Sequence, residues 1–261
     1  MRMTMTKKQK ISLGIVSVLL SAVLAASGVM IYRELSSRQK EKNDFKNLVQ
    51  IVTASPTEPS ETDTPSGESD DEAKPEQTGR NLEELFAMNS DCIGWLCIPG
   101  TAVDYPVMHT PENPQKYLRK NFYGEYSQSG VPFLDGRCDA DSDNLILYGH
   151  NMKNGTMFSN LRYYTDPAFC DEHRTMELET ADGLKLYELF AVLKTNNADE
   201  WYNFITADGN ESFDEHIGSI KARSLYQPDV TPEYGQRILS LSTCYGSSKN
   251  GRLLVIAVQV N

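Results

Sequence analysis

The hydrophobic and polar positions in the C-terminal two thirds of the chain follow the short periods of β-strands. Short runs rich in Val, Ile, Leu and Tyr are separated by turns of Gly, Pro, Asn, Asp and Ser. Many short strands joined by turns favour a barrel or a sandwich over a doubly wound sheet. The pattern predicts eight strands, at residues 94–98, 102–108, 131–134, 144–148, 175–179, 184–194, 237–244 and 252–260.

Helical patterns precede and interrupt these strands. Asn81 is placed to cap a helix, and Glu84 stands at the capping-box position three residues later. Further helices are expected near residues 157–164 and, within an insertion at 196–236, at 212–223.

The N-terminal part of the chain has a different pattern. Residues 11–31 carry no charge, and this length is enough to span a bilayer core of about 30 Å. We interpret residues 11–32 as an uncleaved membrane anchor. A cleaved signal peptide remains an alternative, because the small residues at 24–27 could form a cleavage site. Basic residues occur on both sides of the apolar run, so charge alone does not fix its orientation.

Residues 53–80 are rich in Pro, Ser, Thr and acidic residues and have no apolar periodicity. Such a segment cannot bury enough apolar surface to offset the entropy of ordering it. We therefore expect residues 33–80 to form a juxtamembrane segment, with a short helix at 34–52, followed by a disordered stalk. The folded domain is expected to span residues 81–261.

The net charge of the protein lies in this expected domain. Residues 81–261 contain 14 Lys and Arg against 25 Asp and Glu, a net charge of −11, whereas the charges of residues 1–80 balance. A domain this acidic is a poor nucleic-acid binder, so no nucleic-acid partner is expected.

No metal or cofactor is expected either. The alternating Asp139, Asp141 and Asp143 lack the glycine and glutamate that an EF-hand loop needs at its sixth and twelfth positions. Cys92 and Cys97 lack a second ligand pair at zinc-site spacing. A disulfide remains open among Cys92, Cys97, Cys138 and Cys170.

Cys244 and Arg252 are the first candidates for chemistry. The strands at 237–244 and 252–260 are joined by a short turn, so the residue that ends the first strand should lie beside the residue that starts the second. A guanidinium close to a thiol lowers the pKa of that thiol and raises its thiolate fraction. By residue type alone, a structural cysteine and a surface arginine remain an equal alternative.

A cysteine nucleophile needs an acid–base partner, usually a histidine distant in sequence. His150 directly follows the buried run at 144–148, at the expected mouth of the barrel, and this position suits a catalytic ring. Residue type alone also allows a structural histidine there. His109 is a weaker candidate, and the charged neighbours of His173 and His216 predict surface positions.

Three segments in this order resemble those of the sortases. They are GWLCIPGTAVDYPVM (94–108), NLILYGHNMKNGTMFSNL (144–161) and LSLSTC (239–244) followed by Arg252, and the YGHNM form is similar to class B. The resemblance covers residues 81–261. It implies a mainly β protein, an eight-stranded sortase barrel with an N-terminal helix and a helical insertion before the cysteine strand. It also implies a single-pass membrane transpeptidase of a Gram-positive bacterium, with residues 1–10 cytoplasmic and the catalytic domain extracellular.

The resemblance also implies roles for individual residues. Cys244 attacks the carbonyl of a threonine in the C-terminal sorting motif of a secreted surface protein, His150 protonates the leaving amine, and Arg252 donates hydrogen bonds to substrate or oxyanion. The thioester then passes to an amine of peptidoglycan or of a pilin. The implied substrate contacts are Tyr148, Ser242, Thr243, Leu118 and either Trp201 or Tyr202. The segment 113–118 is one residue longer than the family spacing, which makes the alignment of Leu118 uncertain.

Three alternatives differ from a cell-wall transpeptidase. A pilin-polymerising sortase would differ only in its amine acceptor. A cysteine hydrolase of the same fold would release an acid instead of joining chains. A catalytically silent binding module would not need the cysteine, the histidine and the arginine together.

Overall fold

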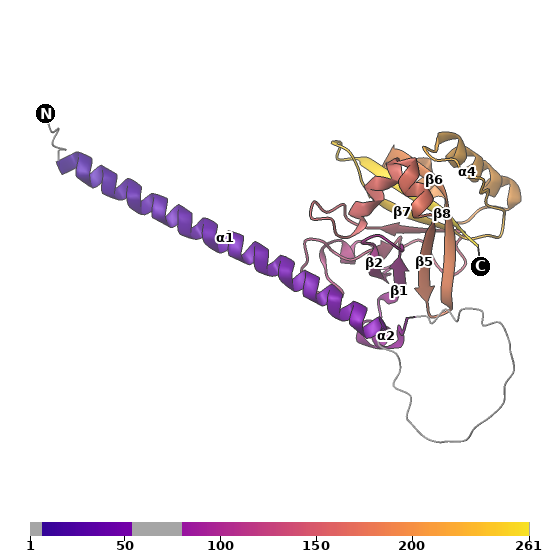
Figure 1. Ribbon diagram of the computed structural model, residues 1–261, viewed down its shortest axis with the longest axis horizontal. Helices are drawn as coiled ribbons and strands as arrows, with labels where there is room; N and C mark the ends of the chain where they lie inside the picture. Colours follow the sequence, from indigo (N-terminus) through magenta and orange to yellow (C-terminus); the bar gives the residue numbers. More distant parts are fainter. Residues whose placement is uncertain (1–6, 54–79, 261) are drawn as a thin grey trace, which may run out of the picture. The chain divides into compact units, whose positions relative to one another are not determined.

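The computed structural model describes residues 7–53 and 80–260, which fall into two compact units separated between Asn47 and Leu48. The first unit lies within the helix α1 (Lys7–Thr53), drawn in indigo in Figure 1. The short helix expected at 34–52 is therefore part of a longer one. By length and composition, Leu19–Thr53 could cross a membrane. Most of the expected stalk, residues 54–79, lies outside the described residues.

The second unit begins with the last turns of α1. Leu48 and Val52 are both buried, and the backbone N–H of Asn81 donates to the carbonyl of Val52 at 3.0 Å. The compact unit thus includes residues upstream of the expected domain start at Asn81.

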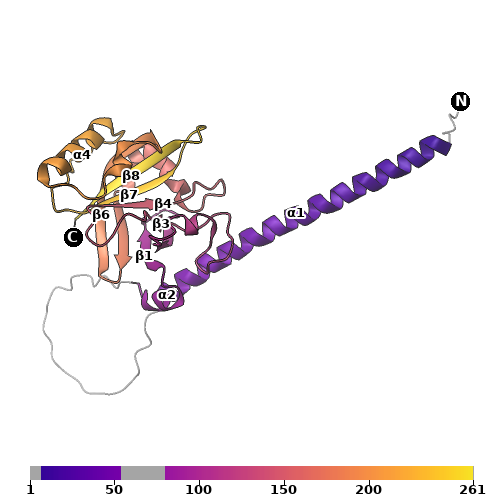
Figure 2. The ribbon, with the colours of Figure 1, turned by 180° about the vertical axis from the view of Figure 1, so that it is seen from behind.

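Eight strands of this unit close into a barrel in the order β1-β2-β3-β4-β7-β8-β6-β5. Figures 1 and 2 show this unit from two opposite sides. The predicted barrel is confirmed, and every predicted strand overlaps an observed one. The strands are β1 (Cys92–Cys97), β2 (Asp104–Met108), β3 (Phe133–Leu134), β4 (Asn144–Tyr148), β5 (Thr175–Thr180), β6 (Gly183–Asn196), β7 (Ile238–Cys244) and β8 (Gly251–Gln259).

Two pairings in the barrel decide where the functional residues lie. β4 and β7 run parallel, with Tyr148 opposite Ser242, so the C-terminal ends of both strands meet at one end of the barrel. β7 and β8 run antiparallel and pair Cys244 with Arg252, as the hairpin pattern predicts. The segments that follow β4 and end β7 are thereby brought together although they are distant in sequence.

The helices lie between the strands, and some differ from the prediction. Leu82, not Asn81, is the N-cap of the first of them, although the Asn81 side chain still accepts from the N–H of Glu83 at 3.3 Å. The helix expected near 157–164 is a 3-10 helix. The helices are α2 (Glu83–Met88), η1 (Lys116–Arg119), η2 (Phe158–Thr165), α3 (Pro167–Glu172), η3 (Glu200–Asn203) and α4 (Asn210–Arg223).

The helix α4 confirms the helix expected within the insertion. Its buried residues Phe213, Ile217 and Ile220 recur at helical spacing and form one apolar face. This face joins a core cluster that also contains Trp201 of η3 and strand residues of β6 and β8. Figures 1 and 2 show α4 against the barrel on the side of β6.

Candidate active site

A groove of about 530 Å³ is lined by the end of β4, the end of β7 and the start of β8. His150, Cys244 and Arg252 all line it. The walls come from the segment 114–118, the segment 129–137 and the region around η3. The structure therefore brings the three expected catalytic residues into one groove.

Three hydrogen bonds join the segment that carries His150 to the strand that carries Cys244. Gly149 donates its N–H to the carbonyl of Ser242 at 3.1 Å, and its own carbonyl accepts from the hydroxyl of Thr243 at 2.7 Å. The side-chain amide of Asn151 donates to the carbonyl of Cys244 at 2.8 Å. Because these bonds flank both residues, the histidine and the cysteine are held on a common backbone framework.

Gly149 is needed for this framework because Phe158 packs directly on its backbone. A Cβ at position 149 would lie 2.5–2.8 Å from atoms of the Phe158 ring, closer than any side chain tolerates. The N–H of Phe158 also donates to the carbonyl of His150 at 2.9 Å. The loop after His150 is therefore closed tightly on the end of β4.

Cys244 is the exposed cysteine of this chain and lies at the end of β7, directly opposite Arg252. The guanidinium of Arg252 is anchored by its own hairpin, because its Nη1 donates to the carbonyls of Lys249 at 3.2 Å and Gly251 at 2.9 Å. The Nε and Nη2 groups of Arg252 have no acceptor among the described residues, so they can donate to a ligand in the groove.

The ring of His150 is half-buried, and its Nε2 lies 2.9 Å from the carbonyl oxygen of Leu118. A carbonyl only accepts, so this contact places a proton on Nε2 and leaves Nδ1 free to exchange one. Burial lowers the pKa of His150 below its ordinary value, the hydrogen bond to Leu118 raises it, and the nearby charge of Arg119 lowers it. The neutral ring is therefore the favoured form near neutral pH.

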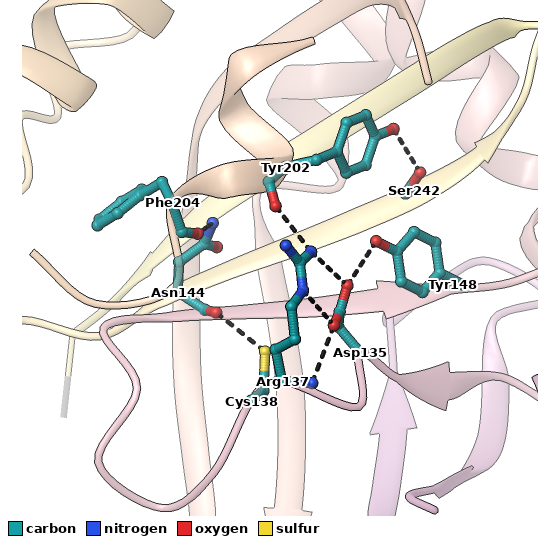
Figure 3. Close-up of polar contacts among 8 residues, drawn as sticks. All are labelled: Asp135, Arg137, Cys138, Asn144, Tyr148, Tyr202, Phe204 and Ser242. Atoms are coloured by element: carbon teal, nitrogen blue, oxygen red, sulfur yellow. Dashed lines mark hydrogen bonds and ion pairs between the residues drawn. The ribbon is translucent and has the colours of Figure 1, made fainter. Parts of the chain in front are cut away.

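Other residues that line the groove form a polar network. Figure 3 draws its hydrogen bonds. The hydroxyl of Tyr148 donates to Asp135 at 2.8 Å, and Asp135 forms a two-pronged ion pair with Arg137. Arg137 also donates to the carbonyl of Tyr202 at 2.8 Å, and the hydroxyls of Tyr202 and Ser242 are hydrogen-bonded at 2.8 Å. The network joins the turn after β3 to η3 and to the ends of β4 and β7.

The network fixes the ionisation of its members. Burial opposes charge on Asp135, but hydrogen bonds from Arg137 and Tyr148 outweigh it and lower the pKa of this carboxyl below its ordinary value. Burial raises the pKa of Tyr148 strongly and that of Tyr202 to about 12. Asp135 is therefore a carboxylate, and both tyrosines keep their protons, across the physiological range.

The structure places five of the six expected substrate contacts on the groove and one elsewhere. Trp201 is 2 % exposed, and its indole donates to the hydroxyl of Ser240 within the core at 2.9 Å. Of the two aromatic residues offered by the insertion, it is therefore Tyr202 that faces the groove. The five that line it are Leu118, Tyr148, Tyr202, Ser242 and Thr243.

Sequence reasoning missed Asp135, Arg137 and Asn151. The first two form an Asp-Gly-Arg turn directly after β3, and Asn151 directly follows His150. A charged pair in a turn after a buried strand is a sequence signal that can indicate a site. The hydrogen bond from this pair to Tyr202, far along the chain, has no such signal in the sequence.

The remaining histidines have structural surroundings. His173 contacts the carbonyl of Pro99 at 3.0 Å, and His216 stacks on Phe204 with the ring centroids 4.3 Å apart. Both were expected at the surface, and the structure shows both half-buried. His109 does not line the groove, and its Nε2 is buried without a hydrogen-bond partner among the described residues.

The cysteines other than Cys244 are also unpaired. Burial raises their pKa values well above the ordinary value, so they are neutral thiols at physiological pH. The values are about 11 for Cys92, Cys97 and Cys138 and about 12 for Cys170. Within residues 7–53 and 80–260, no three His, Cys, Asp or Glu side chains gather as a metal site would require.

Comparison with known proteins agrees with the geometry. The sortase domain model matches residues 96–260. Sortase B of Listeria monocytogenes is 36 % identical over 167 residues, which cover 62 % of this chain and 66 % of that protein.

Two solved structures are similar in fold. They are a Staphylococcus aureus sortase B–substrate complex and a sortase B complexed with triglycine. Each is 28 % identical with a TM-score of 0.64, and the match covers 69 % of this chain and 84 % and 85 % of theirs. The chain therefore belongs to the sortase family of cysteine transpeptidases and, within that family, to class B.

Proposed function

We propose that this protein is an active sortase that cleaves a C-terminal sorting motif after threonine and joins the released carbonyl to an amine of the cell wall. The observation that carries the proposal is the pairing of the exposed Cys244 with Arg252 in one groove with His150. An exposed thiol beside a cation and a titratable ring is the arrangement that nucleophilic catalysis requires.

In the proposed first step, the thiolate of Cys244 attacks the threonine carbonyl carbon and forms a C–S bond. The negative charge moves to the carbonyl oxygen, where the unpaired N–H groups of Arg252 donate to it. Collapse of this intermediate breaks the C–N bond, and the imidazolium of His150 gives a proton from Nδ1 to the leaving amine. A thioester on Cys244 and a neutral histidine remain.

In the second step, an amine attacks the thioester and gives its proton to His150. A new amide forms, and the sulfur leaves as a thiolate, so both residues return to their starting charges. The hydrogen bond from Nε2 of His150 to Leu118 persists through both steps, because Nε2 keeps its proton throughout. Leu118 thus orients the ring while Nδ1 exchanges the proton.

The substrate and the acceptor follow from the relatives. One related structure is a sortase B–substrate complex and another contains triglycine, a peptide with a free amino group. We infer that the groove binds the sorting peptide and that an amine of peptidoglycan accepts it. The apolar part of α1 serves as a single-pass anchor with the catalytic domain outside the cell.

The test is to incubate the full-length protein in detergent micelles with a peptide library and two amines, triglycine and lysine. Mass spectrometry should detect acylated Cys244, cleavage after threonine and a new amide with the amine. An amide with triglycine supports cell-wall anchoring, and one with lysine supports pilin polymerisation. Release of the acid alone, with either amine in excess, would contradict transpeptidation and support the hydrolase.

The matched control is Cys244→Ala in the same experiment. This variant should form no acyl-enzyme and should not react with a methanethiosulfonate reagent at neutral pH. The other four thiols are protonated there because burial raises their pKa values to about 11 or 12. Rapid modification that persists in Cys244→Ala would contradict the assignment of the nucleophile.

A further inference from the structure

The Asp-Gly-Arg turn after β3 presents an arginine to the groove for which the proposed chemistry has no use. The side chain of Arg137 is 53 % exposed, whereas that of its partner Asp135 is only 11 % exposed. Both residues line the groove that contains Cys244. The arginine is therefore available to a ligand, whereas the carboxylate is largely covered. Figure 3 shows the two side chains paired.

Arg137 is held rigidly by contacts on two sides. Its Nε and Nη2 donate to the two oxygens of Asp135 at 2.9 and 2.8 Å, and Nη2 also donates to the carbonyl of Tyr202 at 2.8 Å. Its Nη1 has no acceptor among the described residues. A guanidinium has no acceptor atoms of its own, so this group can bind only an oxygen or another hydrogen-bond acceptor.

Asp135 cannot bind a ligand cation in its place. A carboxylate offers about four acceptor positions, and four donors already occupy them. The donors are the backbone N–H, Nε and Nη2 of Arg137 and the hydroxyl of Tyr148. The pair therefore presents donors to the groove and no free carboxylate.

The position of this pair relative to the thiol also fits a substrate contact. Tyr148 and Ser242 lie opposite each other, two residues before His150 and Cys244 in the chain, and the hydroxyl of Tyr148 donates to Asp135 of the pair. Two residues of strand span roughly 6.6 Å. A peptide whose threonine carbonyl lies at Cys244 and whose remaining residues run back along β7 passes this level, where one of its other side chains can lie beside Arg137.

We infer that Arg137 is a specificity-determining residue that binds an oxygen-bearing side chain of the sorting peptide, a carboxamide or a carboxylate, through its free Nη1. Asp135, Tyr148 and Tyr202 position the guanidinium. The site discriminates against lysine at the same peptide position, because the carboxylate that could pair with it is already saturated. This inference rests on the proposed function and extends it to substrate choice.

The test uses full-length protein and the best peptide from the library. Each position other than the threonine is replaced in turn by Asn, Asp, Ala and Lys, and kcat/KM is measured. At one position the wild type should favour Asn or Asp over Ala and Lys by about tenfold or more, as expected for a hydrogen bond to a charged donor. A preference for Asp over Asn identifies a carboxylate, and the reverse identifies a carboxamide.

Variants of Arg137 distinguish recognition from a structural role. Arg137→Met should remove the preference at that position, and Arg137→Glu should reverse it in favour of Lys. The matched control is Arg174→Met, which removes an arginine from a carboxylate pair with Glu188 that does not line the groove. This variant should keep the wild-type preference.

The outcomes separate this inference from the proposed function. If Arg137→Met slows all peptides equally and keeps the preference, or if the wild type has no such preference at any position, the inference is wrong while the proposed function stands. If the wild type acylates with no peptide, the proposed function fails and this inference fails with it.

Discussion

The floor and the rim of the groove are built in different ways. The floor consists of the end of β4, the end of β7 and the start of β8, joined by ladder hydrogen bonds in a fixed register. The rim consists of residues 114–118, residues 135–137 and η3, and it is held by individual side-chain hydrogen bonds, two of which go to distant carbonyls. The bond from His150 to Leu118 crosses 32 residues of sequence, and the bond from Arg137 to Tyr202 crosses 65.

This difference suggests that the floor carries out the reaction and that the rim selects the substrate. The floor holds Cys244 and Arg252 in one sheet and the backbone of His150 just beyond the end of β4, which is the precision that bond formation needs. The rim can change its side chains without disturbing the strand ladder, as loops on a rigid scaffold generally can. Changes in the floor should therefore reduce the rate for every substrate, and changes in the rim should alter which substrate reacts or how His150 is held.

The largest expected effect comes from Arg252 on the floor. Arg252→Lys keeps the positive charge but loses the planar arrangement of donors, and loss of one oxyanion donor typically costs on the order of 100- to 1000-fold in kcat. We expect Arg252→Lys to lose most of the activity and Arg252→Ala somewhat more, with both proteins folded. Turnover and the pH dependence of Cys244 alkylation should be measured for both.

These measurements also test the competing role of Arg252. If the arginine acts only as a nearby charge that favours the thiolate, the lysine variant should alkylate and turn over nearly as fast as the wild type. Only the alanine variant should then lose reactivity. Near-wild-type turnover of Arg252→Lys would refute the donor role.

A smaller effect is expected at Gly130, which supports the rim. Gly130 has a φ of +61°, and a Cβ there would clash with the carbonyl oxygen of Tyr117 and lie 2.7 Å from that of Leu118. Gly130→Ala should displace the Leu118 carbonyl and weaken its hydrogen bond to His150. A lost hydrogen bond of about 1 kcal/mol corresponds to roughly a fivefold fall in kcat.

Gly124 supplies a matched control for this variant. It also has a positive φ, +79°, but no atom lies within 4 Å of the position that a Cβ would occupy. Gly124→Ala should carry a similar backbone strain, about 1–2 kcal/mol in unfolding free energy, and leave kcat unchanged. Equal kcat values for the two variants would show that Leu118 does not orient the histidine.

The division into floor and rim also explains which parts of the site could be predicted from the sequence. Alternating strand patterns and a short turn are local, so the barrel strands and the Cys244–Arg252 pair could be predicted from them. The parallel pairing of β4 with β7, which brings His150 to Cys244, could be inferred only through the family resemblance. Local patterns do not encode it.

The rim was harder to predict because its contacts are individual and distant. Trp201 and Tyr202 are adjacent aromatic residues with similar composition cues, yet the short 3-10 turn sends one to the core and the other to the groove. The charged turn at Arg137 is a local signal, but nothing in it indicates the bond to the carbonyl of Tyr202, 65 residues away. Neither fact follows from hydrophobic periodicity.

The smallest expected effect concerns His150, whose backbone belongs to the floor and whose ring contacts the rim. Burial lowers its folded pKa below the ordinary value near 6.5, so between these two values the unfolded chain binds more protons than the folded one. The free energy of unfolding must then rise with pH across that window and fall on acidification through it. His109, whose pKa burial also lowers, contributes in the same direction.

NMR titration should therefore place the pKa of His150 below the ordinary value of about 6.5, and urea unfolding should show stability falling as the pH drops from about 7 toward 5. His150→Gln and His109→Gln should each reduce the change in unfolding free energy per pH unit, because each removes one group that binds a proton in the unfolded chain. A His150 pKa at or above its ordinary value, or an unchanged slope in His150→Gln, would contradict the burial effect. In that case the hydrogen bond to Leu118, which raises the pKa of His150, would outweigh burial, and the imidazolium that protonates the leaving amine would be the major form at slightly acid pH.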